Sequence, residues 1–338
     1  MADKVFLTRR IAEEPLARLR GAVDLDLWPG ELPPPRAELL RRVADCDGLL
    51  CLITDKIDGE LLDAAPRLRI VSQMAVGYEN IDVAAATARG IPVGNTPGVL
   101  AETTADLAWM LLLAAARRAL DGVRYIETNR WRTWDPGALL GADVHGATLG
   151  IVGLGGIGAA MARRARGFDM RVLYSGPREK PELAASVGAT FADFAALLHE
   201  SDFVSIHCPL TPQTRKLFNA EAFANMKPGA VLVNTARGGI VDQDALLDAV
   251  RSGHLGGAGL DVTDPEPIPP EHPLLHQERV IVVPHIGSAS VRTRTRMAEL
   301  AVENLLAGLR GERLRHCVNP EVQQSGEEQR TKNKEQKA

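Results

Sequence analysis

The sequence predicts an α/β protein with two Rossmann-like domains, each built on a parallel sheet. Short apolar strands alternate with amphipathic helices at βαβ spacing in two separate series. A glycine-rich turn at residues 153–158 stands between a strand and a helix, and a long Ala/Leu-rich segment separates the two series. A chain of 338 residues is long enough for about two domains.

The first series lies within residues 1–98. Expected strands cover 4–8, 47–54 and 69–74, and another precedes the Pro-rich loop at 28–35. Expected helices cover 11–21 and 38–46, with a short one from Leu61. This alternation is enough to form one α/β unit with a parallel sheet covered by helices.

A long connecting helix is expected over residues 103–131. The segment is rich in Ala and Leu and contains no Gly or Pro before Gly122. Thr103 or Thr104 is a plausible N-cap, because a threonine hydroxyl can accept from the exposed amides of a first turn.

A second βαβ series begins at Thr148. The expected strands are 148–153, 171–175, 202–208, 230–236, 256–262 and 279–287. The expected helices are 156–168, 191–201, 221–227, 242–253 and 290–311. We expect the last helix to cross back to the first series. The segment 321–338 is polar and lacks aromatic residues, so we expect a disordered tail.

Composition excludes several function classes. The formal net charge is −4 and the pI about 6.1, which argues against a nucleic-acid partner. The four cysteines form no C-x-x-C pair, which argues against a metal site. No signal-peptide pattern and no apolar run of membrane-spanning length is present. We therefore expect a cytoplasmic protein with no membrane contact.

The turn GLGGIG has the G-x-G-x-x-G spacing of a dinucleotide-binding loop, at Gly153, Gly155 and Gly158. In that motif the first glycine permits a tight turn, the second lets a pyrophosphate approach the backbone, and the third lets the helix pack on the strand. The strand before and the helix after supply the required context. The alternative interpretation is a purely structural glycine turn.

The cofactor preference is predicted from the end of the second strand of this series. In dinucleotide-binding domains that bind NAD, an acidic residue at this place hydrogen-bonds the ribose hydroxyls. Ser175 occupies that place, and Arg178 and Lys180 follow. A hydroxyl beside cations suits a phosphate monoester, so we expect NADPH in preference to NADH. The alternative is a solvated basic turn.

Three chemistry-bearing side chains follow predicted strands further along the chain. Arg237 can bind a carboxylate bidentately, and His285 is a proton donor near neutral pH. Glu266, between two prolines, can hold the imidazole in one tautomer. Reduction of a 2-keto acid needs this set together with a hydride donor. Taken singly, Arg237 could be an ordinary ion-pair residue and His285 a structural histidine.

Four motifs in order, GLGGIG, NTARGGIVD, GLDVTDPEP and PHIGSA, resemble the D-isomer-specific 2-hydroxyacid dehydrogenase family. The resemblance runs from about residue 4 to 320. Four longer stretches are most similar to the glyoxylate/hydroxypyruvate reductase branch: GLLCLITDKID, TPGVLAETTADLA, GLDVTDPEPIPPEHPLL and PHIGSASVRTR.

The resemblance implies roles for individual residues. His285 would be the acid/base, oriented by Glu266, and Arg237 would hold the substrate. The other substrate-binding residues would be the amides of Val76 and Gly77, with Leu52, Trp134 and Ser288. Trp134 would reach a neighbouring subunit's site, or alternatively serve only as a packing residue of a dimer arm.

A larger set would line the cofactor, with Asp261 against its nicotinamide end. The set comprises Thr104, Gly153, Leu154, Gly155, Gly156, Ile157, Gly158, Ser175, Gly176, Pro177, Arg178, Cys208, Pro209, Thr235, Ala236, Arg237, Asp261, His285 and Gly287.

The family also implies the domain organisation. A flavodoxin-like substrate domain would comprise residues 1–98 and 289–320, and an NAD(P)-binding Rossmann domain residues 99–288. The protein would be a homodimer that reduces glyoxylate or hydroxypyruvate. The alternatives are an NAD-dependent D-lactate, phosphoglycerate or phosphonate-type dehydrogenase and a non-enzymatic corepressor.

Overall fold

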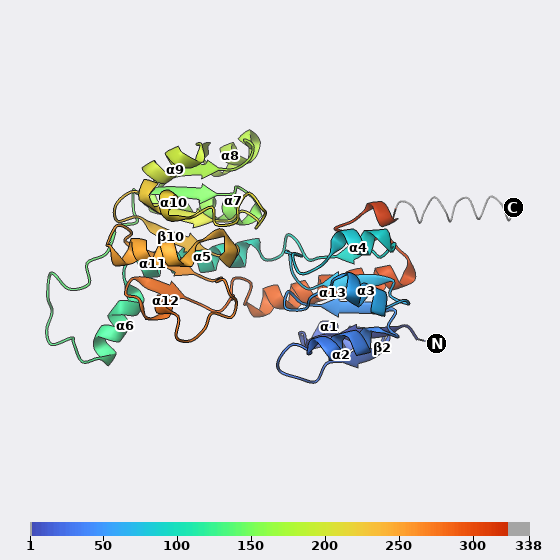
Figure 1. The fold of residues 1–338 in the computed structure, drawn as a ribbon. Coiled ribbons are helices and arrows are strands. Elements are labelled where there is room, and N and C mark those ends of the chain that lie inside the picture. Colours follow the sequence, from blue (N-terminus) through green and yellow to red (C-terminus); the bar gives the residue numbers. More distant parts are fainter. Residues whose placement is uncertain (1, 324–338) are drawn as a thin grey trace. The chain divides into compact units, whose positions relative to one another are not determined.

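The computed structural model describes residues 2–323, and the chain divides into two compact units. Unit 1 joins Met1–Val99 to Ser290–Ala338, and unit 2 is Leu100–Ala289. Each unit contains one parallel sheet, of five and seven strands respectively (Figure 1). The predicted fold class, α/β with two Rossmann-like parallel-sheet domains, is confirmed.

The sheet of unit 1 has the strand order β2-β1-β3-β4-β5. Its strands are β1 (Lys4–Leu7), β2 (Asp24–Leu27), β3 (Gly48–Cys51), β4 (Ile70–Gln73) and β5 (Val93–Gly94). Its helices are α1 (Glu13–Arg20), α2 (Arg36–Val43), α3 (Gly59–Ala64), α4 (Val83–Ala88) and α13 (Val291–Arg310). Strands β3 and β4 are buried along their whole length, as expected of central parallel strands.

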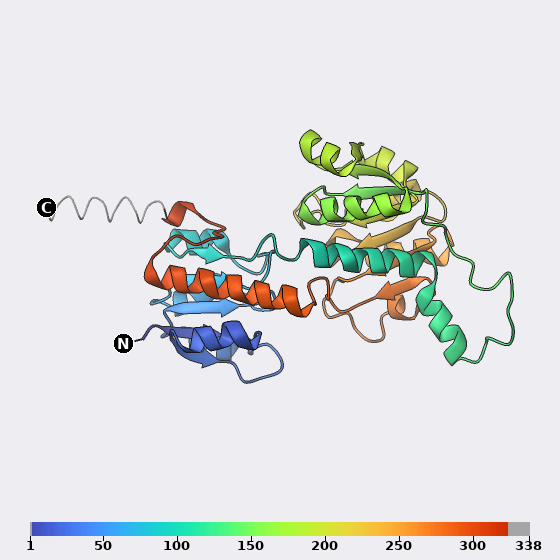
Figure 2. The ribbon, with the colours of Figure 1, turned by 180° about the vertical axis from the view of Figure 1, so that it is seen from behind.

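Helix α13 returns to unit 1 from the far end of the sequence and packs on β3 and β4, beside α1 (Figure 2). Its buried stripe includes Leu305 and Leu309, whose methyl carbons would lie 3.1 and 3.2 Å from a Cβ at Gly48. The opposite face of the sheet packs with α2, α3 and α4 around one apolar cluster. Unit 1 is therefore a sheet between two helical layers, and the last helix, α13, forms one of these layers together with α1.

The sheet of unit 2 has the order β12-β11-β10-β9-β6-β7-β8. Its strands are β6 (Thr148–Val152), β7 (Arg171–Ser175), β8 (Ala189–Phe191), β9 (Phe203–Ile206), β10 (Val231–Asn234), β11 (Gly257–Leu260) and β12 (Val280–Val282). Its α-helices are α5 (Ala101–Ala116), α6 (Ala119–Glu127), α7 (Gly156–Ala165), α8 (Pro181–Val187), α9 (Phe194–Glu200), α10 (Ala220–Asn225), α11 (Gln243–Arg251) and α12 (Pro273–His276).

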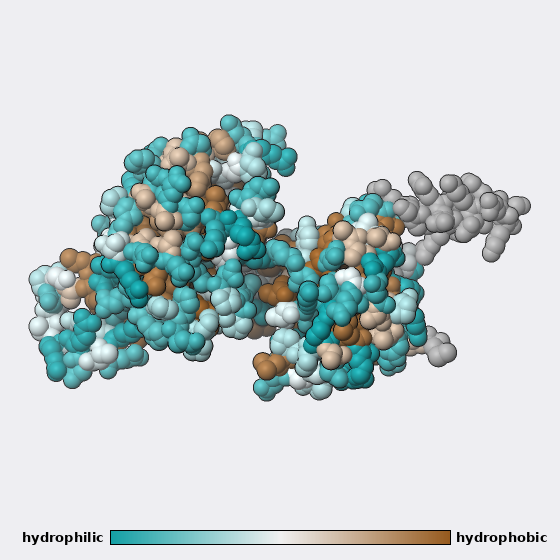
Figure 3. Space-filling view, in the orientation of Figure 1, coloured by the Kyte–Doolittle hydropathy of each residue, from teal (hydrophilic) through white to brown (hydrophobic). Residues whose placement is uncertain are grey.

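Two apolar clusters cover the two faces of this sheet. Helices α5 and α7 lie side by side on one face (Figure 2), and α9, α10 and α11 pack on the other. The strand order reverses between β6 and β9, so the loops after these two strands diverge at their carboxyl ends. Open parallel sheets bind ligands at such a point. On the face drawn in Figure 3, hydrophilic residues cover most of the unit.

The prediction of one helix over residues 103–131 is wrong. Helix α5 already starts at Ala101, so neither Thr103 nor Thr104 is its N-cap, and it ends at Ala116. Arg118 then takes a left-handed conformation with φ 52° before α6 begins. The break comes from distant partners, because Ala142 N donates to Ala116 O at 2.9 Å and Arg118 pairs with Glu278 at 3.1 Å.

Several further elements were not predicted, namely the short helices α4, α8 and α12 and the strands β5 and β8. The expectation of disorder from residue 321 is wrong for residues 321–323, which are helical, and the Gln323 side chain accepts from Leu314 N and donates to Glu312 O. The rest of that expected tail, 324–338, lies outside the described residues. Within residues 2–323, no helix has both the length and the apolar character needed to cross a membrane.

Candidate active site

The glycine loop joins β6 to α7 at the carboxyl end of the sheet. Gly153 has φ +101°, and a Cβ there would lie 2.7 Å from Cys208 N. A Cβ on Gly158 would lie 2.4 Å from Gly153 O, so this glycine lets α7 approach β6 closely. A Cβ on Gly155 would meet no protein atom within 4 Å. Contacts within the protein therefore explain why Gly153 and Gly158 are glycines. They do not explain the glycine at position 155.

These features fit a dinucleotide. Open space at Gly155 and the amino end of the ten-residue helix α7 provide the approach and the amide groups that a pyrophosphate requires. The other predicted members Leu154, Gly156 and Ile157 belong to the same turn. The hydroxyl oxygen of Thr235, after β10, is buried without a hydrogen-bond partner among the described residues. An orphaned donor in this place suits a bound polar ligand.

The basic turn after β7 divides its two cations between different tasks. Ser175 is buried at the strand end, and Gly176 and Pro177 lead to the exposed Arg178. The Nζ of Lys180 instead donates a hydrogen bond to Leu154 O at 2.9 Å, and this bond stabilises the glycine loop. The sequence pattern suggests one basic turn for Arg178 and Lys180, whereas in the structure Arg178 is exposed and Lys180 contacts the glycine loop.

Arg237 follows β10 and lies partly buried at the same edge of the sheet. Its guanidinium donates to Ala236 O at 2.7 Å. Its charge also acts on Glu266, because it helps to lower the pKa of that carboxyl. The guanidinium and the carboxylate thus belong to one electrostatic cluster.

The His285 and Glu266 side chains are in direct contact. Nδ1 of His285 lies 2.5 Å from Glu266 Oε1, and both side chains are about one-third exposed. Burial acts to raise the pKa of Glu266, but the hydrogen bond and charge of His285 outweigh it and hold this pKa below its ordinary value. With Nδ1 committed to the carboxylate, Nε2 is the nitrogen from which a proton can pass to a ligand.

Asp261, at the end of β11, holds the loop that carries His285. Its two carboxylate oxygens accept from Ile286 N at 2.6 Å and Gly287 N at 2.8 Å, and its carbonyl accepts from His285 N at 2.9 Å. Burial raises the pKa of Asp261 despite these bonds. His285 itself has φ 53°, a sparsely populated conformation that needs surrounding contacts to persist.

Two more predicted cofactor-lining residues join Asp261. A Cβ on Gly287 would lie 3.0 Å from Asp261 Oδ2 and 3.2 Å from Thr104 Cγ2. Thr104 on α5, Asp261 and Gly287 therefore form one tight cluster behind the His285 loop. Ser288 lies further along the same loop.

The loop after β9 carries Cys208, whose backbone lies close to Gly153, and then Pro209. Burial raises the pKa of the Cys208 thiol to about 11, so it is neutral at physiological pH. The same burial lowers the pKa of the preceding His207 to about 4, and its ring lies 2.8 Å from Ser205 Oγ. No sequence pattern singled out His207, which is neutral at physiological pH as well.

The predicted residues of unit 1 lie on two adjoining loops. Leu52 follows β3 and is half-buried, while Val76 and Gly77 follow β4. Asn80 donates to Leu52 O at 3.1 Å and so joins the two loops.

Trp134 lies apart from this chemistry, in the long segment after α6 that extends from the body of unit 2 (Figure 1). Its side chain is 79% exposed. Within one chain, the structure does not place it against the His285–Glu266 pair.

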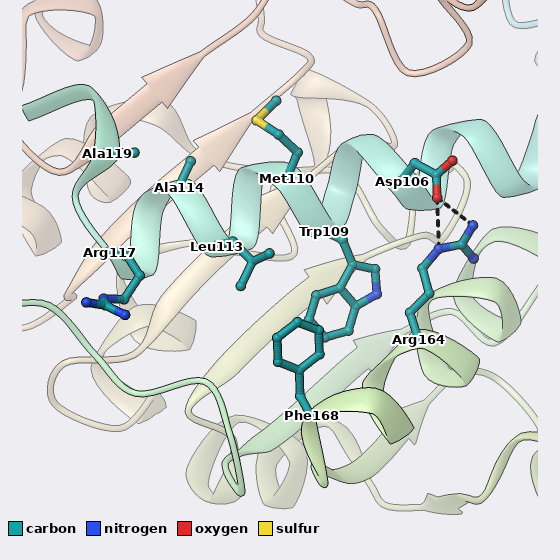
Figure 4. Close-up of a pocket in the computed structure, with 9 residues that line it drawn as sticks. All are labelled: Asp106, Trp109, Met110, Leu113, Ala114, Arg117, Ala119, Arg164 and Phe168. Atoms are coloured by element: carbon teal, nitrogen blue, oxygen red, sulfur yellow. Dashed lines mark hydrogen bonds and ion pairs between the residues drawn. The ribbon is translucent and has the colours of Figure 1, made fainter. Parts of the chain in front are cut away.

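One hollow of unit 2 lies away from these residues. A shallow depression of about 760 Å³ lies over α5 and α7, where Trp109 stacks on Phe168 and Arg164 pairs with Asp106 (Figure 4). None of the predicted site residues lines it. We therefore place the candidate active site at the strand ends and treat the hollow as a separate surface. Among residues 2–323, no cluster of potential metal ligands was found.

Comparison with known proteins gives the family. The model of the D-isomer specific 2-hydroxyacid dehydrogenase NAD binding domain matches residues 109–287. The chain is 52% identical to glyoxylate reductase of Korarchaeum cryptofilum, over 95% of this chain and 97% of that protein. It is 46% identical to glyoxylate reductase of Thermococcus litoralis, over 95% and 98% respectively.

Solved structures agree. The TT0316 protein of Thermus thermophilus superposes with a TM-score of 0.88 at 48% identity, covering 93% of this chain and 99% of that one. An NADPH-dependent glyoxylate/hydroxypyruvate reductase of Sinorhizobium meliloti, solved with NADP and malonate, gives 0.83 at 33% identity, covering 95% and 98%. The resemblance predicted from the four motifs is confirmed. The chain belongs to the D-isomer specific 2-hydroxyacid dehydrogenase family and is an oxidoreductase that uses a nicotinamide dinucleotide.

Proposed function

We propose that this enzyme reduces small 2-keto acids, glyoxylate and hydroxypyruvate, to 2-hydroxy acids with NADPH as the preferred donor. The single observation that carries the proposal is the 2.5 Å contact between His285 and Glu266 beside the charge of Arg237. Relatives named glyoxylate reductase, which match nearly the whole chain, support the choice of substrate.

The residues of this chain would act as follows. Arg237 binds the substrate carboxylate and polarises the adjacent keto oxygen. The amides of Val76 and Gly77 would bind the carboxylate as well, and Leu52 and Ser288 are the further substrate-binding residues that we propose. The bound dinucleotide supplies the hydride that the keto carbon accepts. His285 donates a proton from Nε2 to the keto oxygen as it becomes a hydroxyl, while Glu266 stabilises the protonated ring through Nδ1.

We assign the dinucleotide to the glycine loop and the strand ends around it. The residues that would hold it are the predicted set, from Thr104 and Gly153–Gly158 through Ser175–Arg178, Cys208, Pro209 and Thr235–Arg237 to Asp261, His285 and Gly287. The exposed guanidinium of Arg178 beside the uncharged Ser175 favours a ribose phosphate. Asp261, which is bonded to two loop amides, supports the site mainly by fixing the His285 loop.

The test is a steady-state screen of glyoxylate, hydroxypyruvate, pyruvate and phosphonopyruvate, each with NADPH and NADH. We expect the highest kcat/KM with glyoxylate or hydroxypyruvate and NADPH. Arg178→Ala should weaken the affinity for NADPH and leave the affinity for NADH unchanged. Arg251 is exposed on α11, and Arg251→Ala should change neither affinity. A wild-type preference for NADH, or for phosphonopyruvate, would contradict the proposal.

We also propose that the enzyme is a homodimer formed through unit 2. The support is apolar surface: the hollow over α5 and α7 lies on the unit that also exposes large apolar side chains along α6 and the segment after it. These exposed side chains are Val123, Ile126, Trp131, Trp134 and Leu140. Sedimentation equilibrium should give a dimer for the wild type and a monomer for Met110→Glu, which alters the hollow. A monomeric wild type would overturn this assignment.

A further inference from the structure

Three successive peptide groups in unit 1 have their carbonyls held by the protein. Ala75 O accepts from Thr96 N at 2.9 Å, Val76 O from Asn95 Nδ2 at 2.9 Å, and Gly77 O from Gln73 Nε2 at 2.6 Å. The segment follows β4 directly and contains no regular secondary structure. Side chains and a neighbouring strand end therefore take over the role that a sheet ladder would otherwise fill.

The orientation of the amides follows from these bonds. All three peptides are trans, so the N–H of each points opposite to its carbonyl. The N–H groups of Val76, Gly77 and Tyr78 are thus directed away from the groups that hold the carbonyls. No hydrogen bond from these three amides is found among residues 2–323, and Val76 and Tyr78 are 37% and 42% exposed. Consecutive backbone amides in a turn can form an anion-binding concavity.

The donor to Gly77 is fixed by its own partner. The side-chain amides of Gln73 and Asn80 bond each other reciprocally, at 2.8 and 2.9 Å. Asn80 also donates to Asp55 O at 2.7 Å, and Gln73 is fully buried. Gln73 Nε2 has two hydrogens, one for Asn80 and one for Gly77, so its orientation admits no second arrangement that satisfies the same partners.

The donor to Val76 is fixed from the last helix. Asn304 on α13 is fully buried and donates to Asn95 O at 2.9 Å, while its Oδ1 accepts from His316 N at 3.2 Å. A Cβ on Gly94 would lie 2.9 Å from the Asn304 Cβ, so only glycine there leaves room for this side chain. The backbone beside Asn95 is thereby held in place.

We propose that Gln73 and Asn95 are positioning residues that aim the amides of Val76, Gly77 and Tyr78 at the substrate carboxylate, with Tyr78 N–H as a third donor. This inference rests on the proposed function. Neither side chain touches the substrate. Each acts through the carbonyl it holds, and Asn80 and Asn304 act one step further back by fixing the two donors.

The test compares a charged with a neutral substrate. Asn95→Ala removes the donor to Val76 O, and Gln73→Glu replaces the donor to Gly77 O with an acceptor. We measure kcat/KM for glyoxylate and for methylglyoxal, a keto compound without a carboxylate. Loss of one well-aimed hydrogen bond to a charged group should lower the glyoxylate/methylglyoxal ratio about tenfold to a hundredfold, mainly through KM. The Kd for NADPH should stay unchanged.

Asn319→Asp is the matched control, because Asn319 is a buried amide of the same unit that bonds Val93 N and Ile91 O and no part of the loop. It should destabilise unit 1 without changing the ratio. Gln73→Glu buries a charge, so a failure of that variant to fold leaves the partly exposed Asn95→Ala as the deciding case. A folded Asn95→Ala with the wild-type ratio would overturn the inference. A wild type that turns over neither glyoxylate nor hydroxypyruvate would overturn the proposed function instead.

Discussion

Two loops that follow parallel strands, residues 74–80 after β4 and 283–289 after β12, are fixed in opposite ways. In the first, the side-chain amides of Gln73 and Asn95 bind backbone carbonyls. In the second, the carboxylate of Asp261 binds the backbone amides of Ile286 and Gly287.

The difference shows how the chemistry of the holding side chain decides what a loop presents. A side-chain amide that donates to backbone carbonyls leaves the backbone N–H groups of the loop available to a ligand. The first loop therefore offers backbone N–H groups. A carboxylate that accepts hydrogen bonds from backbone N–H groups occupies those groups. The second loop therefore offers a side chain to the ligand, that of His285. The first arrangement suits recognition of an anion, and the second suits proton transfer.

The largest effect is expected from removing the side chain that the second loop presents. His285→Ala should lower kcat about 10²–10⁴-fold, the usual contribution of a positioned general acid, while NADPH binding stays nearly unchanged. Steady-state kinetics and fluorescence titration of the cofactor measure the two effects. His199→Ala, at an exposed site on α9, is the control. A turnover close to that of the wild type in His285→Ala would contradict the assignment of His285 as the proton donor.

The next effect comes from weakening the hold on that loop. Asp261→Asn replaces one acceptor by a donor that faces a backbone N–H, and an unsatisfied buried group costs about 1–3 kcal/mol of stability. Displacement of His285 should lower kcat by up to about a hundredfold. Urea unfolding and kinetics measure both, with the exposed Asp264→Asn as control. Loss of NADPH affinity at unchanged kcat would show that Asp261 acts on the cofactor instead.

A smaller effect is expected from Glu266→Gln. The pKa of Glu266 is lowered, so its charge and the stability it contributes are fully present above its ordinary pKa and lost as pH falls through the lowered value. The variant lacks the charge at every pH. The protonated form of the ring then has less support, and the high-pH limb of the kcat/KM profile should move to lower pH by about one unit. An unmoved limb would count against the pair.

The smallest effect is expected from Asp55 in unit 1. Its contribution to stability depends on pH in the opposite direction to that of Glu266. Burial raises the pKa of Asp55, although Leu52 N and Thr8 Oγ1 donate to it. The stability linked to Asp55 is therefore fully present below its ordinary pKa and lost as pH rises through the raised value. Thermal midpoints of Asp55→Asn and wild type, compared from pH 4 to 7, should shift in favour of the variant as pH rises. A constant difference would show that Asp55 does not titrate in this range.

Local patterns in the sequence predict most of the fold but little of what holds these loops. The glycine loop and the strands before Arg237 and His285 depend on neighbouring residues, so they are visible in the sequence. The break at Arg118 depends on Ala142 and Glu278, which no pattern within the helix indicates.

The loop anchors escape prediction for the same reason. Gln73 and Asn95 are ordinary polar residues in the sequence. Their roles arise only when β4, β5 and α13 come together, which brings Asn304 to Asn95 across 209 positions.

That long separation has a consequence for the order in which the chain is made. Residues 1–99 leave the ribosome before unit 2, whereas helix α13, which packs on their strands β3 and β4, leaves it after unit 2. Unit 2, whose sequence is uninterrupted, can complete its core while β3 and β4 still lack that cover. Apolar strands that wait in this state are prone to aggregation. Nascent-chain proteolysis should therefore find unit 2 protected before the segment that emerged ahead of it.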